Sequence, residues 1–290
     1  MPNNIVLAKN YTSLLDEVYK KNSVTADLIA PNELVRAGSN AKTVLYPMVS
    51  VNGLGDYDRN SGYTDGSVSV NWEEITFDYD RGTKISVDTM DNQESFNIAF
   101  GRAGSELIRT RVVPEGDAYT FARIAGTTGI STVDAGVTYA DGAELLLGIA
   151  EAVSKMDEDE VPSENRLLYV TPSLHNMIAM LDTTKSREIL SGFSKVVKVP
   201  QSRFYTKIDL LSGKNGEDVG GYKKAEDGND INFMIVHKDA IVKIDKHIAS
   251  DVIDPNSNPN SDSYILKYRK YGVVDVMKNK RAGIYMSYKA

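Results

Sequence analysis

The sequence predicts an α+β protein of one large or two modest domains. Strand-like runs gather near residues 43–87 and 231–288, and helical apolar spacing is prominent between them. Of the 290 residues, 41% are hydrophobic, which is enough to bury a sizeable core, while 25% are charged. The net charge of −7 argues against a chain that binds nucleic acid tightly over its whole surface.

The chain contains no cysteine, which excludes disulfides, thiolate chemistry and cysteine-ligated zinc. Its first residues lack the pattern of a secretory signal, and the most apolar stretch, residues 145–153, is too short to cross a bilayer. We therefore expect no membrane contact and a protein that works in the compartment where it is made.

The first 46 residues predict an extended arm. Ordering one backbone residue costs roughly 1–2 kcal/mol, and this segment has too few apolar residues to form a core of its own. A short helix capped by Thr12 or Ser13 is the one regular element expected there. We therefore expect the arm to be ordered largely by contacts with other chains.

A hairpin and a long helix are expected next. Strand-like runs at 43–46, 68–72, 75–79 and 84–87 surround a loop rich in Gly, Asn and Asp, residues 51–67. From Asp91 the apolar spacing becomes helical, with one stripe that comprises Phe96, Phe100, Ala103 and Leu107.

Pro114 interrupts this helix. Because proline inside a helix costs ~3 kcal/mol, we expect the helix to bend or end there and to resume over residues 115–125.

The remainder mixes helices with strands. Asp141 and Glu144 predict the start of one helix, and Thr171 with Pro172 the start of another. The polar, glycine-rich residues 213–230 predict a surface loop. Strands are expected at 167–170, 231–236, 240–244, 264–277 and 283–288.

Three stretches resemble parts of the HK97-fold major capsid proteins of tailed double-stranded DNA bacteriophages. Residues Val112–Tyr119 (VVPEGDAY) resemble the spine region of that family. Residues Phe233–Val242 (FMIVHKDAIV) resemble the strand pair after the A-domain loops, and Tyr268–Tyr285 (YRKYGVVDVMKNKRAGIY) resembles the common ending. Together with the order of the elements, the resemblance covers nearly the whole chain.

The resemblance implies an α+β, HK97-like capsid fold with five parts. They are an N-terminal arm (1–46), an extended β-hairpin or E-loop (47–88), a P-domain with the long spine helix (89–135), a compact A-domain (136–240) and the closing strands of the P-domain sheet and the A-domain (241–290).

The implied function is structural and non-enzymatic. The chain would be a major capsid subunit of the virion that self-assembles as hexamers and pentamers into an icosahedral shell around packaged double-stranded DNA. The resemblance also implies assembly in the bacterial host cytoplasm, portal and scaffolding proteins as partners, and weak, non-specific contact of an acidic wall with the DNA. The alternatives are an encapsulin-type bacterial nanocompartment shell of the same fold, a tail or other virion protein, and an enzyme that uses paired carboxylates.

No motif predicts a catalytic, cofactor-binding or metal site. Residues 56–62 begin like a calcium loop, but Ser61 stands where the glycine is needed and Ser67 where the final glutamate belongs. Gly53 and Gly55 lack the third glycine and the following helix of a dinucleotide site.

The other residues that could carry chemistry are also better explained by ordinary structural roles. The acidic run 157–160 is typical of a solvated helix end. Residues 47–82 contain no lysine, so the isopeptide crosslink that some shells of this fold form from the E-loop is doubtful. The three histidines lack a close metal-ligand spacing: His175, His237 and His247.

The charges are segregated along the chain. Residues 47–82 hold seven acidic and two basic side chains, a net charge of −5, whereas residues 264–290 hold seven basic and one acidic, a net charge of +6. Either these are two solvated faces, or the hairpin of one subunit lies over the closing strands of its neighbour. Under the second hypothesis the contact residues are Asp56, Asp58, Asp65, Glu73 and Glu74 on the hairpin and Lys278, Lys280 and Arg281 on the closing strands.

Overall fold

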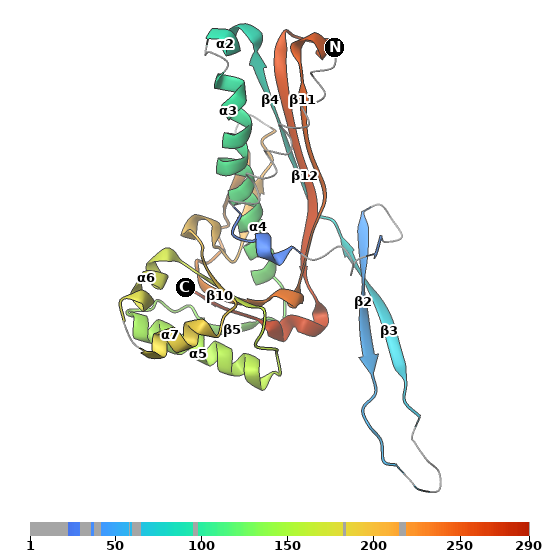
Figure 1. The fold of residues 1–290 in the computed structure, drawn as a ribbon, viewed down its shortest axis with the longest axis vertical. Helices are drawn as coiled ribbons and strands as arrows, with labels where there is room; N and C mark the ends of the chain where they lie inside the picture. Colours follow the sequence, from blue (N-terminus) through green and yellow to red (C-terminus); the bar gives the residue numbers. More distant parts are fainter. Residues whose placement is uncertain are drawn as a thin grey trace.

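In a computed structural model of the chain, an elongated unit lies beside a compact unit, and a long hairpin projects from their junction (Figure 1). The residues that the structure describes are 23–29, 36–37, 42–57, 59, 65–94, 98–181, 184–214 and 219–289. The expected helix near Thr12 and the apolar position Phe96 lie outside these ranges.

The compact unit is built on a five-stranded sheet whose order is β5-β13-β10-β6-β7. Every residue of β10 and of β6 is buried, which explains why both read as nearly continuous apolar runs. The strand bounds are β5 (Ser131–Ala135), β6 (Arg166–Val170), β7 (Lys195–Lys198), β10 (Ile231–His237) and β13 (Ile284–Tyr288).

Helices cover both faces of this sheet. One face packs against α5 (Gly142–Glu158), α6 (Pro172–Ala179) and α7 (Thr184–Ser191), and the other against α4 (Val113–Ala125). The predicted start of α5 is confirmed, because the Asp141 carboxylate accepts hydrogen bonds from the backbone N–H groups of Ala143 and Glu144 at 2.8 and 2.9 Å.

The elongated unit is a three-stranded antiparallel sheet with helices alongside (Figure 1). Its order is β11-β12-β4, and the strands are β4 (Tyr79–Asp88), β11 (Ile241–Ile253) and β12 (Ser263–Val276). The helical run comprises α2 (Thr89–Glu94), α3 (Ile98–Leu107), the π-helical turn η3 (Ile108–Val112) and α4. Ile108 and Val113 of this run pack against Leu266 and Tyr268 of the sheet.

The expectation that the helix ends at Pro114 is wrong: the chain stays helical through it, and a π-helical turn stands just before the proline. In η3 the backbone N–H of Val113 donates to the carbonyl oxygen of Ile108, five residues earlier. Pro114 then stands in the first turn of α4, where a missing N–H costs little.

The hairpin consists of β2 (Thr43–Val51) and β3 (Val68–Thr76), with the short β1 (Arg36–Ala37) on the other edge of β2. The sequence-based boundary at residue 47 falls inside β2, and β4 pairs with β12 rather than with the hairpin. Among the described residues of the hairpin, only those at the root are buried, where Val44, Tyr46 and Ile75 pack against Val242 and Val273.

The predicted loop at residues 213–230 contains a strand. Residues Gly221–Lys224 form β9, which pairs with β8 (Ile208–Leu211). This strand lacks an apolar alternation, and Gly220 and Gly221 both adopt positive φ, so the local sequence gave only turn signals. The short 3-10 turns of the fold are η1 (Ala26–Leu28), η4 (Gln201–Arg203), η5 (Lys238–Ala240), η6 (Pro255–Ser257) and η7 (Lys278–Gly283).

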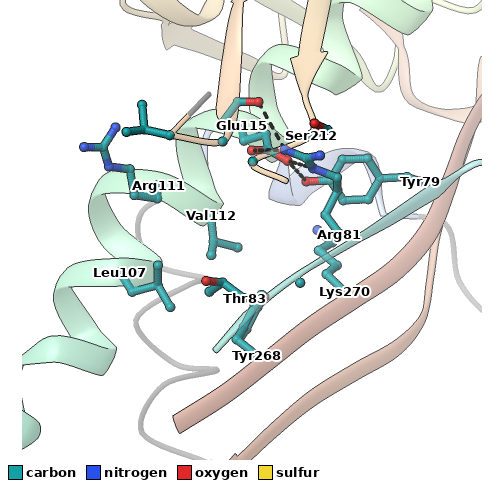
Figure 2. A pocket seen from close by; sticks show the side chains of 15 residues that line it. Tyr79, Arg81, Thr83, Leu107, Arg111, Val112, Glu115, Ser212, Tyr268 and Lys270 are labelled. Carbon is teal, nitrogen blue, oxygen red and sulfur yellow. Dashed lines mark hydrogen bonds and ion pairs between the residues drawn. The ribbon is translucent and has the colours of Figure 1, made fainter. Parts of the chain in front are cut away.

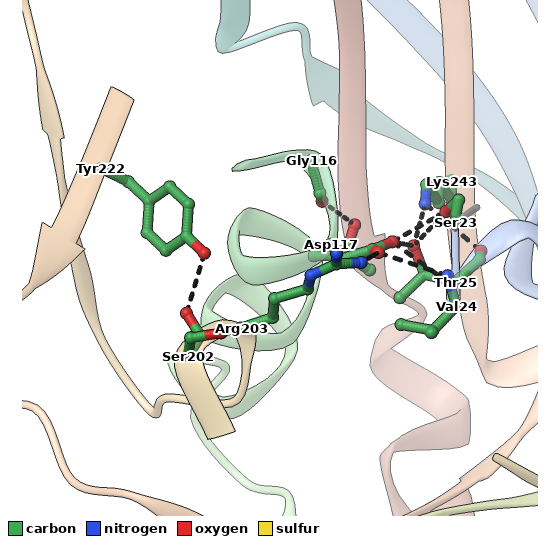
Figure 3. Close-up of polar contacts among 10 residues, drawn as sticks. Ser23, Val24, Thr25, Gly116, Asp117, Ser202, Arg203, Tyr222 and Lys243 are labelled. Atoms are coloured by element: carbon green, nitrogen blue, oxygen red, sulfur yellow. Dashed lines mark hydrogen bonds and ion pairs between the residues drawn. The ribbon is translucent and has the colours of Figure 1, made fainter. Parts of the chain in front are cut away.

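The expectation that the arm lies on other chains is wrong for residues 23–29. This segment packs into the core of its own subunit: Leu28 is 1% exposed and belongs to the main apolar cluster, and Thr25 is fully buried. Ile29 forms a parallel bridge with Lys243 of β11. So short a segment can be ordered because the rest of the subunit supplies apolar partners for Leu28 and polar partners for Ser23 and Thr25. The polar partners are shown in Figure 3. Much of the remaining arm lies outside the described residues.

Gly142→Ala should destabilise the subunit by about 1–3 kcal/mol. An added Cβ would overlap the carbonyl oxygen of Met177, so α5 would have to move away from α6. Urea unfolding of the unassembled subunit measures the effect. Gly53→Ala is the matched control, because nothing lies within 4 Å of its added Cβ; equal effects of the two substitutions would contradict the packing described.

Lys243 should make stability depend on pH. Burial, with the nearby Lys270, lowers the pKa of its ammonium from 10.5 to about 8. Between these values the unfolded chain binds more protons than the folded chain, so folding is increasingly favoured as pH rises. The free energy of unfolding of wild type minus that of Lys243→Met should therefore rise between pH 8 and 10.5, by about 3 kcal/mol at most. Urea titrations at several pH values test this, and a flat or falling difference would count against it.

Candidate intersubunit contact surfaces

One face of the projecting hairpin is an apolar stripe. Residues that pair directly across two strands share a face, and the pairs Pro47–Trp72, Val49–Val70 and Val51–Val68 alternate with pairs that face the other way. All six members are exposed. The side chains other than Pro47 have these exposed fractions: Val49 58%, Val51 67%, Val68 66%, Val70 51% and Trp72 43%. We call these six residues the outer stripe.

The apolar surface continues toward the tip of the hairpin. Leu54 is fully exposed and Tyr57 is 60% exposed, and Asp56 and Asp65 are exposed beside them. Burying a side chain such as valine or leucine is worth about 1.5–3 kcal/mol. A contiguous apolar surface rimmed by polar groups is typical of a protein contact site.

The strand that carries half of this stripe is an edge strand. In the order β1-β2-β3 the outer side of β3 has no neighbouring strand among the described residues. A long apolar edge is prone to pair with other chains unless a neighbour covers it. The hairpin is therefore the part of the described subunit that most requires a partner.

The structure pairs Glu73 with Lys278 inside one chain. The Lys278 Nζ lies 2.5 Å from the Glu73 Oε2, which ties the root of the hairpin to the turn η7. The Glu73 carboxylate raises the pKa of the Lys278 ammonium. Burial at the root of the hairpin raises the pKa of the Tyr46 hydroxyl. The charge hypothesis placed this pair between neighbours, but the pair forms without a neighbour.

The other candidate contact residues are not brought together within the subunit. Asp56 and Asp65 lie near the exposed tip, and Asp58 lies outside the described residues. Glu74 and Lys280 are exposed, whereas Arg281 is half-buried and packs against Gly129.

Part of the charge segregation is neutralised across β4 and β12. The Arg269 guanidinium binds the Asp80 carboxylate through two hydrogen bonds of 2.6 and 2.8 Å, and the hydrogen bonds lower the pKa of Asp80. Asp78 at the start of this region lies 3.4 Å from Arg123. Counting charges along the sequence therefore overstates the charge that is free to meet a neighbour.

A pocket of about 320 Å³ lies between the helical run and β4 (Figure 2). It is lined by a cluster of hydrogen-bonded polar side chains that the sequence did not reveal. The Arg81 Nε donates to the Glu115 carboxylate at 2.7 Å, and the Tyr79 hydroxyl donates to the same oxygen at 3.1 Å. Arg81 also donates to the carbonyl oxygen of Gly221 in β9 at 3.1 Å. Glu115 is the glutamate of the VVPEGDAY stretch, so that residue joins α4 to β4 and β9 rather than acting as a free acid.

No catalytic arrangement is apparent in the described part of the chain. Across those residues no group of three or more His, Asp or Glu side chains could hold a metal ion. His175 and His237 lie on different elements, and burial lowers the pKa of each. The same ranges hold no helix that is long and apolar enough to cross a membrane.

Neither the protein-family models nor the curated proteins contain a match to the sequence. Solved structures are similar over most of the chain. The capsid structure of cyanophage P-SCSP1u matches with a TM-score of 0.59 at 13% identity, over 88% of this chain and 85% of that one. Gordonia phage Cozz gives a TM-score of 0.59 at 12% identity, over 93% and 87%. The virus-like particle from Pyrococcus furiosus gives 0.58 at 11% identity, over 97% and 99%.

At such low identity the likeness shows the fold. The chain has the α+β, HK97-like fold of phage capsid structures, which confirms the fold class predicted from the sequence. The projecting hairpin, the helical run beside the three-stranded sheet and the compact α/β unit correspond to the E-loop, spine helix, P-domain sheet and A-domain that the resemblance implied.

Lys278→Glu should loosen the root of the hairpin, because it sets two carboxylates against each other at Glu73. Amide hydrogen exchange in β2 and β3 should become faster in the unassembled subunit, and adding Glu73→Lys should reverse the effect. Lys280→Glu is the matched control on the same turn, since this exposed side chain has no hydrogen bond or ion pair with the described residues. If the double variant exchanges as fast as Lys278→Glu, the pair does not hold the hairpin.

Proposed function

We propose that the chain is a structural virion protein, the major capsid subunit of a tailed double-stranded DNA bacteriophage. The observation that carries the proposal is the outer stripe on the projecting hairpin of an HK97-like fold. A subunit that works alone gains nothing from a stripe of six exposed apolar side chains on an edge hairpin. A subunit that tiles a shell buries that stripe against the next copy.

Self-assembly would proceed through hexamers and pentamers that close into an icosahedral shell. Obligate contacts between subunits bury roughly 2,000 Å² or more. The outer stripe with Leu54 and Tyr57 supplies an apolar centre for such a contact, and the exposed acids Asp56 and Asp65 supply a polar rim. Tight association then follows from burial, as in a domain core divided between two chains.

Charge would set the register of the hairpin on its neighbour. In this proposal Asp56, Asp65 and Glu74 of one subunit approach Lys280 and Arg281 of the next. A single exposed pair contributes only about 0–1 kcal/mol, so the stripe provides the affinity and the charges select the position. Salt at physiological strength screens such pairs beyond roughly 8 Å.

The acidic balance of the chain also fits a container for DNA. A net charge of −7 gives the wall little attraction for a polyanion, so packaged DNA would touch it weakly and non-specifically. Under this proposal the protein resides in the virion capsid, is assembled in the cytoplasm of the bacterial host, and has portal and scaffolding proteins as partners.

An encapsulin-type bacterial compartment shell of the same fold is the second candidate function. The likeness to the virus-like particle from Pyrococcus furiosus, over nearly all of both chains, supports the shared fold but does not favour this function over a capsid. The contents of purified particles separate the two: a capsid contains genomic DNA when isolated from infected cells, and a compartment contains protein cargo. An enzyme using paired carboxylates has no comparable support within the described residues.

The expressed chain should form closed shells that negative-stain microscopy resolves. Val49→Thr combined with Val70→Thr should raise the concentration needed for assembly by roughly tenfold or more. Threonine keeps the shape and strand preference of valine but adds a hydroxyl that is costly to bury. Val219→Thr is the matched control, since that residue is 99% exposed and lies outside the hairpin. Normal assembly of the paired variant, or no shells from wild type, would contradict the proposal.

A further inference from the structure

The carboxylate of Asp117 is buried in α4 and is surrounded by donors from a distant segment. It accepts hydrogen bonds from the hydroxyls of Ser23 and Thr25, both at 2.7 Å. It also accepts from the backbone N–H groups of Val24 and Thr25, at 3.2 and 3.3 Å. These donors are more than 90 positions away in the sequence, and Figure 3 shows them converging on one side chain.

Two cations from other elements complete the arrangement. The Arg203 guanidinium of η4 lies 3.2 Å from the Asp117 carboxylate. The Lys243 ammonium of β11 is fully buried and donates to the Thr25 hydroxyl at 2.6 Å and to the Thr25 carbonyl at 3.3 Å. Lys243 therefore has its hydrogen-bond acceptors on the N-terminal segment (Figure 3).

Apolar contacts hold the other half of the segment. Leu28 inserts into the main core cluster, which includes Phe121 of α4 and Tyr169 of β6. The Tyr169 hydroxyl is buried and has no hydrogen-bond partner in the described part of the chain. Asp27 makes an exposed ion pair with Lys195 of β7 at 2.5 Å.

The buried charges of Asp117 and Lys243 are fully compensated only when residues 23–29 are in place. Without residues 23–29, the buried Asp117 carboxylate would keep Arg203 as its one hydrogen-bond partner among the described residues, and the Lys243 ammonium would lose both of its acceptors there. An unpaired buried charge is strongly destabilising. Asp117, Arg203 and Lys243 are therefore arranged for a ligand, and the ligand is a short peptide with two hydroxyls and a leucine that includes the 3-10 turn η1.

The segment also bridges the two units of the fold. Asp117 and Lys243 belong to α4 and β11 of the elongated unit, whereas Lys195 belongs to β7 at the edge of the compact sheet and Arg203 to the turn η4 that follows it. The segment contacts Asp117, Lys243 and Lys195 directly, and Arg203 binds the same Asp117 carboxylate, so the cluster joins one unit to the other.

We propose that Asp117, Arg203 and Lys243 form a peptide-binding socket whose ligand is the segment Ser23–Ile29, and that its occupancy locks the compact unit to the elongated unit in the orientation used for assembly. The last clause rests on the proposed shell function; the binding site does not. The segment acts as a detachable strap, and the socket recognises it by its hydroxyl donors, its backbone and Leu28.

A peptide added to the full-length chain tests the socket. The triple variant Ser23→Ala, Thr25→Val, Leu28→Ser weakens the tethered strap while leaving the socket intact. A labelled synthetic peptide of residues 23–29 should bind this unassembled variant at least about tenfold more tightly than it binds wild type, because two charge-assisted hydrogen bonds and a buried leucine are restored in trans. A peptide with the same three substitutions should not bind, and adding Asp117→Asn to the variant should abolish binding.

Equal binding to wild type and variant, equal binding of both peptides, or no binding to a folded variant would overturn the proposal. If the variant fails to fold, hydrogen exchange of otherwise wild-type subunits decides. Asp117→Asn should speed exchange in residues 23–29 and in η4 by about tenfold or more, while β10 stays protected. Asp27→Asn, the matched change at the exposed pair, should leave exchange at η4 unaltered; equal effects would refute the socket.

Particle formation is scored separately. If wild type assembles and Asp117→Asn subunits bind no peptide and form misshapen or no shells, both parts of the proposal hold. If the peptide result is as expected but wild type forms no shells, the proposed shell function fails and the socket stands. Normal shells from Asp117→Asn would overturn the locking role.

Discussion

The buried carboxylate of Asp117 constrains much of the described subunit. A negative charge at this depth must be compensated, and its compensation comes from residues 23–25, from η4 and, through Thr25, from β11. These groups are separated by tens to hundreds of residues, so they meet only when the helical run, the compact sheet and the N-terminal segment are all in place. Docking of the compact unit on the elongated unit is therefore cooperative, and the polar cluster stabilises one relative orientation of the two.

The hairpin, in contrast, leaves many of its side chains exposed in the single subunit. Its root is secured by an apolar cluster and by the Glu73–Lys278 pair, but beyond the root its apolar side chains face outward. The compact unit buries both faces of its sheet, although Leu147 and Met180 stay exposed, whereas the hairpin leaves a whole stripe of apolar side chains uncovered. The chain thus combines a core that folds on its own contacts with a hairpin whose apolar face would be buried only on association. This combination is expected of a subunit that tiles a shell.

Local patterns in the sequence predicted most of the elements. Alternation and apolar runs located the hairpin strands, β6, β10 and the closing strands, and Asp141 marked the start of α5. What the sequence could not give were contacts between distant positions. Residues 23–29 looked like part of an exposed arm because their partners Asp117 and Lys243 lie far along the chain, and Glu73 was assigned to a neighbour because charge counts carry no information on distance. β9 was missed because its pairing with β8 is not encoded in an apolar alternation.

The π-helical turn η3 restricts where insertions and deletions can be tolerated in this sequence. Ile108 and Val113 both face the sheet although five positions separate them, a spacing that an ordinary helix would place on different faces. Deleting one residue in this turn would rotate everything N-terminal to it by about 100° relative to α4. Insertions and deletions should consequently be purged here over evolutionary time, whereas a change of length near the exposed tip residues Leu54 and Asp56 would not disturb the subunit's own core. Comparing sequence lengths at these two places across related phages would reveal which part of the chain is held to a fixed count and which is open to variation.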